Sequence, residues 1–219
     1  MPTSIPVQRL RRIAVALTTT LVLSSSAWAI SEAQFQPAYA QFIQATQGNE
    51  AAIEKSAEAF MALLAQEPVN PVLMAYAGAA TSMKALTTML PWKKMRYSED
   101  GMAMLDKALA MLTAAHNAPL QHEIPAALEV RFVACNTFLA VPGFMNRGAR
   151  GTKLLNDVLA NPLLASAPLS FRGDVWMKAA EVAAKDKRTA EARKYLDEVI
   201  KANAPQAQAA RAQLQALAS

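Results

Sequence analysis

Glycine and cysteine are both scarce in this chain of 219 residues, which contains 7 Gly and 1 Cys. A glycine share of roughly half the usual level is typical of a mostly helical protein. Cys135 is the single cysteine, so no intramolecular disulfide can form and packing has to hold the fold. Hydrophobic residues make up 53% of the chain and charged residues 18%, which excludes a disordered or collagen-like chain.

Motifs that carry chemistry are also absent from the sequence. Nothing that resembles a nucleophile elbow surrounds any serine. The two histidines, His116 and His122, lack the i, i+4 relation of a helical zinc pair and have only Glu123 nearby. Gly148 and Gly151 follow no strand pattern, and the Lys-Ser/Thr signature of a phosphate loop is missing. We therefore predict no catalytic residue, no metal site and no cofactor.

The first 29 residues contain three arginines and no acidic residue. An apolar stretch at 13–23 follows the arginines, and a small polar stretch then ends in Ala-Trp-Ala at Ala29. This three-part layout is typical of a secretory signal peptide, and the interrupted apolar run is shorter than the ~20 residues that a membrane span needs. We predict a signal peptide over 1–29, cleavage after Ala29, a single helical-repeat domain over 30–219 without a transmembrane span, and a periplasmic location.

The formal net charge of +5 comes largely from this leader. Without its three arginines, the 22 basic and 17 acidic residues become about 19 and 17. Binding to nucleic acid or to an anionic membrane through overall charge needs a dense basic footprint, which the mature chain lacks. The charge balance therefore excludes nucleic acid as a predicted partner.

Apolar residues after the leader recur at helical spacing almost throughout, and no alternating strand pattern of useful length competes. Helix starts are indicated by Ser31 with Gln34, by Asn49 and by Ser98, and Pro91 is expected to end the third helix. The sequence thus predicts an all-α chain of about nine helices in antiparallel pairs. The expected ranges are 31–46, 49–66, 71–90, 98–117, 125–140, 147–160, 174–185 and 189–202, with a ninth helix from 205.

Residues 173–206 carry the strongest sign of an internal repeat. The positions that carry it are Trp176, Ala180, Ala192, Leu196 and Pro205. They resemble the tetratricopeptide repeat, whose two helices favour Trp and small residues and are followed by Pro. A weaker echo is found at Ser56, Phe60, Leu63 and Pro68. The resemblance implies an irregular tetratricopeptide-like α-solenoid, and the mature chain looks like bacterial exported repeat proteins that are uncharacterised.

Two groups of cations and aromatic rings are candidate binding residues. The first is Trp92, Lys93, Lys94 and Tyr97, expected in an extended connector between helices. The second is Phe144 with Arg147, in a Gly-rich turn. Flat rings beside cations can hold a carboxylate, a phosphate or a peptide. The alternative is that the rings seal the connector onto the stack while the charged heads stay in solvent.

Arg131 falls on the same apolar helix stripe as Leu128 and Cys135. A guanidinium on such a stripe needs a partner. Asp106, on the apolar side of the preceding helix, is the expected partner in an inter-helix ion pair, and Cys135 is expected to be a buried structural thiol. If a ligand supplies the negative charge instead, Arg131 becomes a binding residue.

These observations predict an exported non-catalytic adaptor that binds a peptide or partner protein in the groove of a helical-repeat stack. Two alternatives stay open. One is a small-molecule carrier that binds an anionic ligand near Arg131, and the other is an enzyme whose active site has no recognisable motif in the sequence.

Overall fold

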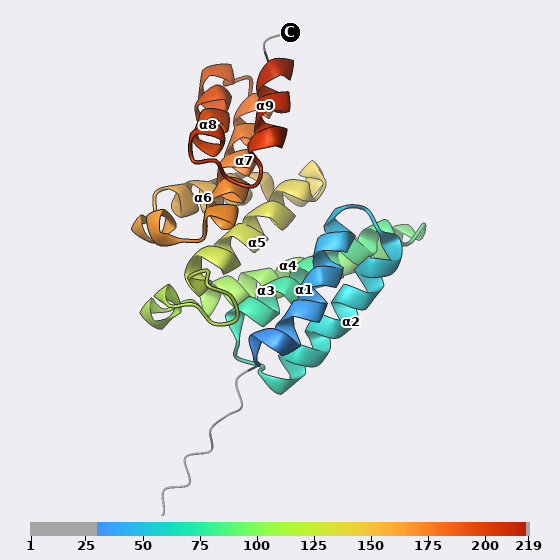
Figure 1. Ribbon diagram of the computed structural model, residues 1–219. Helices are drawn as coiled ribbons and strands as arrows, with labels where there is room; N and C mark the ends of the chain where they lie inside the picture. The colour runs from blue at the N-terminus through green and yellow to red at the C-terminus, as the bar shows by residue number, and fades with distance from the viewer. Residues whose placement is uncertain (1–29, 218–219) are drawn as a thin grey trace, which may run out of the picture.

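The computed structural model describes residues 30–217, which form nine α-helices and four short 3-10 helices (Figure 1). The all-α prediction is confirmed for this part of the chain, where an isolated bridge between Pro119 and Pro125 is the one β-type pairing. The predicted signal peptide at 1–29 lies outside the described residues. The α-helices are α1 (Glu32–Thr46), α2 (Glu50–Gln66), α3 (Pro71–Met83), α4 (Pro91–Ala110), α5 (Ala126–Ala140), α6 (Gly148–Leu159), α7 (Leu169–Lys185), α8 (Thr189–Lys201) and α9 (Ala207–Ala216).

Helices α1 and α2 begin at the capping residues that the sequence indicates. Ser31 forms a capping box with Gln34 at the start of α1, and the Asn49 side chain accepts a hydrogen bond from the Ala52 amide at the start of α2. Asn70 caps α3 in the same manner. These side chains satisfy amides that have no partner within their own helix.

Helix α3 is the centre of the N-terminal part, because it is buried on every side. Helices α1, α2, α4 and α5 all pack against it. Rings of Phe35, Phe60 and Tyr76 meet beside it with centroids 5.0–5.5 Å apart. Its low polarity all round is what a helix surrounded by other helices requires.

The start of α4 differs from the expectation. The helix begins at Pro91, not at Ser98, so Trp92 to Tyr97 form its first turns and not an extended connector. Proline at the first helical position loses nothing, because the amide that it lacks would have no partner there. Helix α3 ends at Met83, seven residues before the expected end, and the 3-10 turn Lys84–Leu86 follows it.

Helices α3 and α4 lie unusually close together at Gly78 and Gly101. A Cβ added to Gly101 would lie 2.5 Å from the Gly78 carbonyl oxygen and 2.6 Å from the Ser82 amide nitrogen. The two glycines therefore allow the backbones to approach in a way that no larger residue permits.

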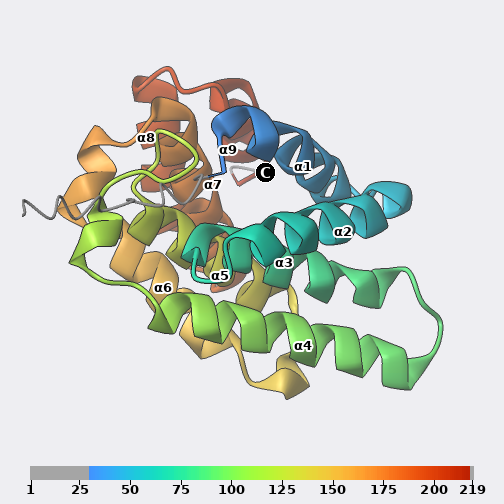
Figure 2. The same ribbon diagram turned by 90° about the horizontal axis from the view of Figure 1, so that it is seen from below.

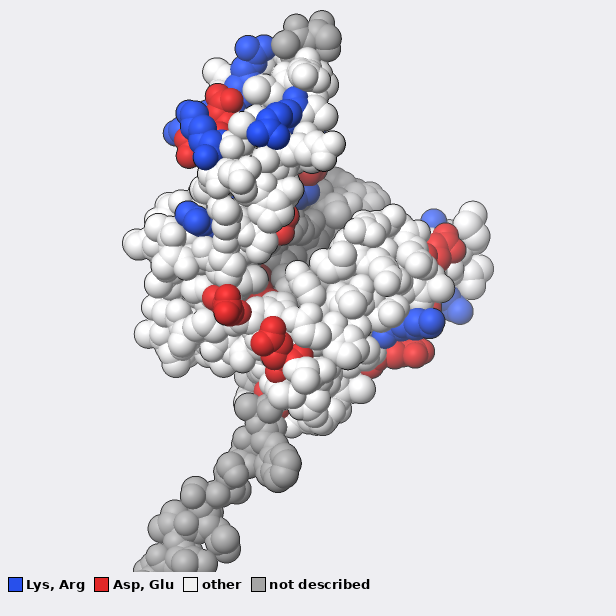
Figure 3. Space-filling view, in the orientation of Figure 1, with Lys and Arg blue, Asp and Glu red and all other residues white. Residues whose placement is uncertain are grey.

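The C-terminal helices α7 to α9 extend away from the α1–α4 part (Figure 1). The largest buried cluster runs from Ile30 to Ala179, and a second small cluster joins α7, α8 and α9. Between α1 and the α7–α9 part, the surface is hollowed (Figure 3). Within residues 30–217, no helix is both long and apolar enough to cross a membrane.

Candidate functional site

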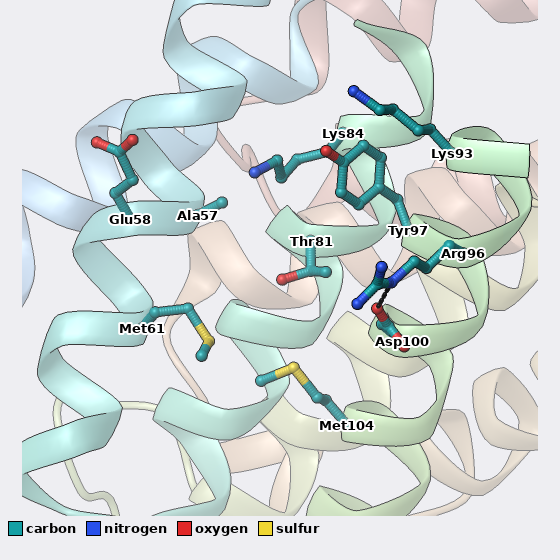
Figure 4. A pocket seen from close by; sticks show the side chains of 10 residues that line it. All are labelled: Ala57, Glu58, Met61, Thr81, Lys84, Lys93, Arg96, Tyr97, Asp100 and Met104. Carbon is teal, nitrogen blue, oxygen red and sulfur yellow. Dashed lines mark ion pairs between the residues drawn. The ribbon is translucent and has the colours of Figure 1, made fainter. Parts of the chain in front are cut away.

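A groove of about 670 Å³ lies between α2 and α4, with the end of α3 at its base (Figure 4). Helix α3 packs against both neighbours, and α2 and α4 diverge on either side of it (Figure 2). The groove is lined by Ala57, Glu58, Met61, Thr81, Lys84, Lys93, Arg96, Tyr97, Asp100 and Met104.

Positive charge is concentrated on one side of this groove. Lys84 forms an ion pair with Glu54 at 2.9 Å, and this hydrogen bond raises the pKa of the lysine. Arg96 lies 3.6 Å from Asp100 in a solvent-exposed pair, a kind that contributes little to stability. Lys93 has no ion-pair partner in the described part of the chain. The groove therefore presents cations that an incoming carboxylate can bind.

The end of the groove with Met61 and Met104 is apolar and adaptable, and Glu58 lies farther along the α2 side (Figure 4). Met61 of α2 and Met104 of α4 extend toward each other below Thr81 (Figure 4). Methionine side chains are flexible and polarisable, so they fit apolar groups of different shapes. The ring of Tyr97 lies among the cations, between Lys84 and Lys93 (Figure 4), with the Lys84 Nζ 5.0 Å from its centroid.

The structure divides the first predicted binding group between the groove and the outer surface. Lys93 and Tyr97 line the groove, together with Arg96 and Lys84, which the sequence reasoning did not select. Trp92 and Lys94 are exposed to solvent outside it. The division follows from the helical conformation, because residues that are neighbours in sequence point in different directions from α4.

The second predicted group lies on the opposite face of α4. Phe144 and Arg147 line a smaller pocket of about 320 Å³ together with Met95 and Met102. Met95 and Met102 are about half a turn around α4 from Lys93 and Tyr97. The two predicted groups therefore do not form one site.

The predicted ion pair between Asp106 and Arg131 is wrong. The Asp106 carboxylate instead pairs with Arg147 at 2.9 Å and with Arg150 at 2.6 Å, both near the start of α6. Arg131 donates through Nη1 to the carbonyl oxygen of Ala127, 2.8 Å away on its own helix. Helix α5 is buried on nearly all sides, so its apolar stripe does not define a single inward face.

Sequence reasoning missed a buried polar cluster where α1, α3 and α5 meet. Glu129 of α5 is 1% exposed and accepts a hydrogen bond at 2.8 Å from the Tyr76 hydroxyl, and the same Glu129 oxygen lies 2.8 Å from the His122 Nδ1. The rings of Phe35 and Tyr39 pack edge-on against His122, with centroids 4.4 and 4.7 Å away. The signal that could have found it is Glu129 itself, a carboxylate inside the apolar run Ala126–Val130.

Burial governs the pKa of the two phenols in this cluster. Burial raises the pKa of Tyr76 well above its ordinary value, and the charge of Glu129 adds to the shift. Burial also raises the pKa of Tyr39, with further contributions from Glu129 and Asp174. Both phenols therefore stay protonated at neutral pH, and the Tyr76 hydroxyl remains the donor to the carboxylate.

Cys135 is fully buried, as the sequence predicts, and burial raises the pKa of its thiol to about 12. A thiol in this state is a packing group and not a nucleophile. Among residues 30–217, no group of three His, Cys, Asp or Glu side chains is arranged to hold a metal ion.

Comparison of the chain with protein-family models, with curated proteins and with solved structures finds no match.

Proposed function

We propose that this chain is a non-catalytic binding protein that holds a peptide segment of a partner protein in the groove between α2 and α4. The observation that supports this proposal is the combination in one groove of an adaptable apolar end, at Met61 and Met104, with the unpaired Lys93 and the weakly paired Arg96. Grooves between helices are common binding sites for short amphipathic segments.

The chemistry of the groove indicates the kind of segment that fits. A carboxylate side chain of the peptide would bind at Lys93 and Arg96, and aliphatic or aromatic side chains would pack on Met61, Met104 and Tyr97. A helical segment presents such residues three or four positions apart on one face. The preferred partner is therefore a segment with acidic and apolar residues at helical spacing.

We also propose that the chain acts after export, in a periplasmic location, and that its helices form a tetratricopeptide-like stack. The composition of residues 1–29 supports export. The stack is supported by the close packing of α7 on α8, where Ala180, Ala192 and Leu196 are all buried. Such stacks form extended concave surfaces that bind partners.

Site-specific photocrosslinking in the producing cells tests the peptide proposal. A photoreactive residue at position 61 lies in the groove, and one at position 211 lies on the exposed surface of α9 as the matched control. We expect position 61 to crosslink to a defined partner, and Arg96→Glu in the same chain to reduce that product strongly. Equal products from positions 61 and 211, or a product that Arg96→Glu leaves unchanged, would contradict the proposal.

A second candidate is a carrier for a small anionic molecule, since the same cations line a groove of drug-like size. Native mass spectrometry of the chain purified from the cell distinguishes the two functions. A bound small molecule that is lost in Arg96→Glu, together with no crosslinked protein from position 61, would favour the carrier.

A further inference from the structure

Exposed apolar side chains are concentrated at the connection between α3 and α4. Five of the ten exposed large apolar residues of the described chain lie within residues 86–95. Met89 is 88% exposed, Leu86 69% and Trp92 67%. Single exposed apolar residues are ordinary, but a contiguous group of this kind marks a contact surface.

Apart from Met95, which lines the pocket of Phe144, the residues of this group form a protrusion and not a cavity. The connection between α3 and α4 projects from the edge of the molecule, away from the helices that form the core (Figures 1 and 2). Met89 and Leu86 lie outside the groove between α2 and α4, because neither belongs to its lining. Projecting apolar side chains insert into a bilayer or into the surface of a partner, whereas a groove binds a peptide segment.

The charged side chains around residues 86–95 favour an anionic bilayer as the surface that these apolar residues contact. Residues 85–96 contain no acidic residue, and their lysines Lys93 and Lys94 are exposed without an ion-pair partner among the described residues. Arg96 is exposed too, and it pairs with Asp100. The neighbouring Glu54 is already paired with Lys84. Trp rings prefer the headgroup level of a membrane, and Lys side chains next to them extend to the phosphates while their stems stay in apolar surroundings.

We propose that residues 86–95 are a membrane-docking tip, which inserts Leu86, Met89 and Trp92 into the interfacial layer of an anionic bilayer. Lys94, which lies outside the groove, binds the lipid phosphates at its edge. This inference goes beyond the peptide-binding function and does not depend on it. Overall charge gives no sign of such a site, because the three cations are offset by acidic residues elsewhere in the chain.

Trp92 provides a direct probe of the tip. The chain contains three tryptophans, Trp28, Trp92 and Trp176. The double variant Trp28→Phe, Trp176→Phe leaves Trp92 as the only emitter, and the matched double variant Trp28→Phe, Trp92→Phe leaves Trp176, which is half-buried in α7. Each is titrated with vesicles of phosphatidylcholine and phosphatidylglycerol that carry brominated acyl chains, and with vesicles of phosphatidylcholine alone.

We expect the emission of Trp92 to shift to the blue and to be quenched by the brominated lipid in anionic vesicles, while Trp176 is unaffected. Lys94→Gln should lower the partition coefficient about fivefold, the loss for one cation near an anionic surface. Leu86→Ser with Met89→Ser should lower it about tenfold or more without changing the melting temperature, since both side chains are exposed.

Three results would overturn the proposal. One is a Trp92 emission that anionic vesicles neither shift nor quench. Another is an unchanged partition coefficient in the Leu86→Ser, Met89→Ser variant, which would assign membrane binding to a different part of the chain. The third is a blue shift of Trp92 that grows with protein concentration in the absence of vesicles, which would make the tip a contact between two copies.

Discussion

The Tyr76 hydroxyl donates a hydrogen bond to the Glu129 carboxylate across 2.8 Å, and this bond joins α3 to α5 in the interior of the protein. The same Glu129 oxygen also contacts His122, while the second carboxylate oxygen has no hydrogen-bond partner within the described residues. A buried carboxylate with so few partners depends strongly on each of them.

Tyr76→Phe should lower the free energy of unfolding by about 1–3 kcal/mol, because it removes one of the two partners of a buried carboxylate. Chemical denaturation measures the change. Tyr195→Phe is the matched control, since its hydroxyl lies 3.4 Å from Glu191 in a more exposed place, and we expect a change within about 0.5 kcal/mol. Equal losses in the free energy of unfolding for the two variants would show that the buried hydrogen bond contributes no more to stability than the exposed one.

Asp106 should couple energetically to Arg147 and not to Arg131. The carboxylate is within 2.9 Å of Arg147, and the half-exposed position limits the coupling to about 1 kcal/mol. We expect Asp106→Asn and Arg131→Met to be additive within about 0.5 kcal/mol, and Asp106→Asn and Arg147→Met to be less than additive. Urea unfolding of the single and double variants provides both cycles, and a large coupling of Asp106 to Arg131 would contradict the observed pairing.

Most helix positions could be predicted from local signals. Side chains at Ser31 and Asn49 act on amides only three residues away, so the sequence around them contains all that decides the helix start. Pro91 is ambiguous at this level, because proline both ends helices and begins them. The role that it takes at the start of α4 is visible only in the fold, as is the close contact of Gly101 with Gly78, 23 positions away.

The candidate site could be predicted only in part, for a related reason. The cluster around Trp92 is recognisable as a composition, but the helix distributes its members over several directions, and only Lys93 and Tyr97 reach the groove with Arg96. Ion-pair partners are even harder to predict from the sequence, since Asp106 pairs with arginines that lie about 40 positions further along the chain. Helical periodicity predicts on which face of its helix a residue lies, but not which other helix packs against that face.

Gly101→Ala should destabilise the protein by about 1–3 kcal/mol, even though alanine is the better helix former. The added methyl group would lie 2.5 Å from the Gly78 carbonyl oxygen, so α3 and α4 would have to separate. Gly148→Ala in the first turn of α6 is the control, because nothing lies within 4 Å of its Cβ, and we expect unchanged or slightly higher stability. Thermal melts of both variants test this, and an unchanged melting temperature for Gly101→Ala would refute the close helix contact.

Cys135 should not react with a thiol reagent at pH 8 while the protein is folded, and it should react fully in denaturant. Burial blocks access and raises the thiol pKa to about 12, so almost no thiolate forms. An acid whose pKa is raised by folding favours the folded state fully below its unfolded pKa of about 8.5, and this contribution is lost as the pH rises from there toward 12. Labelling followed by intact mass measures the reaction, and rapid labelling without denaturant would contradict the burial.

The two pockets beside α4 should respond differently to reversal of charge. Lys93→Glu with Arg96→Glu should weaken capture of a partner at the α2–α4 groove by about tenfold or more and make the remaining binding less sensitive to salt. Their exposed heads contribute little to folding, so the melting temperature should stay nearly the same. Arg147→Glu should lower the melting temperature, because it places a second carboxylate next to Asp106. Capture at the groove should stay the same, because the groove is intact in this variant. Quantitative crosslinking from position 61 and thermal melts separate the two effects. Loss of capture in Arg147→Glu with full capture in the groove variant would move the binding site to the pocket of Phe144 and Met95.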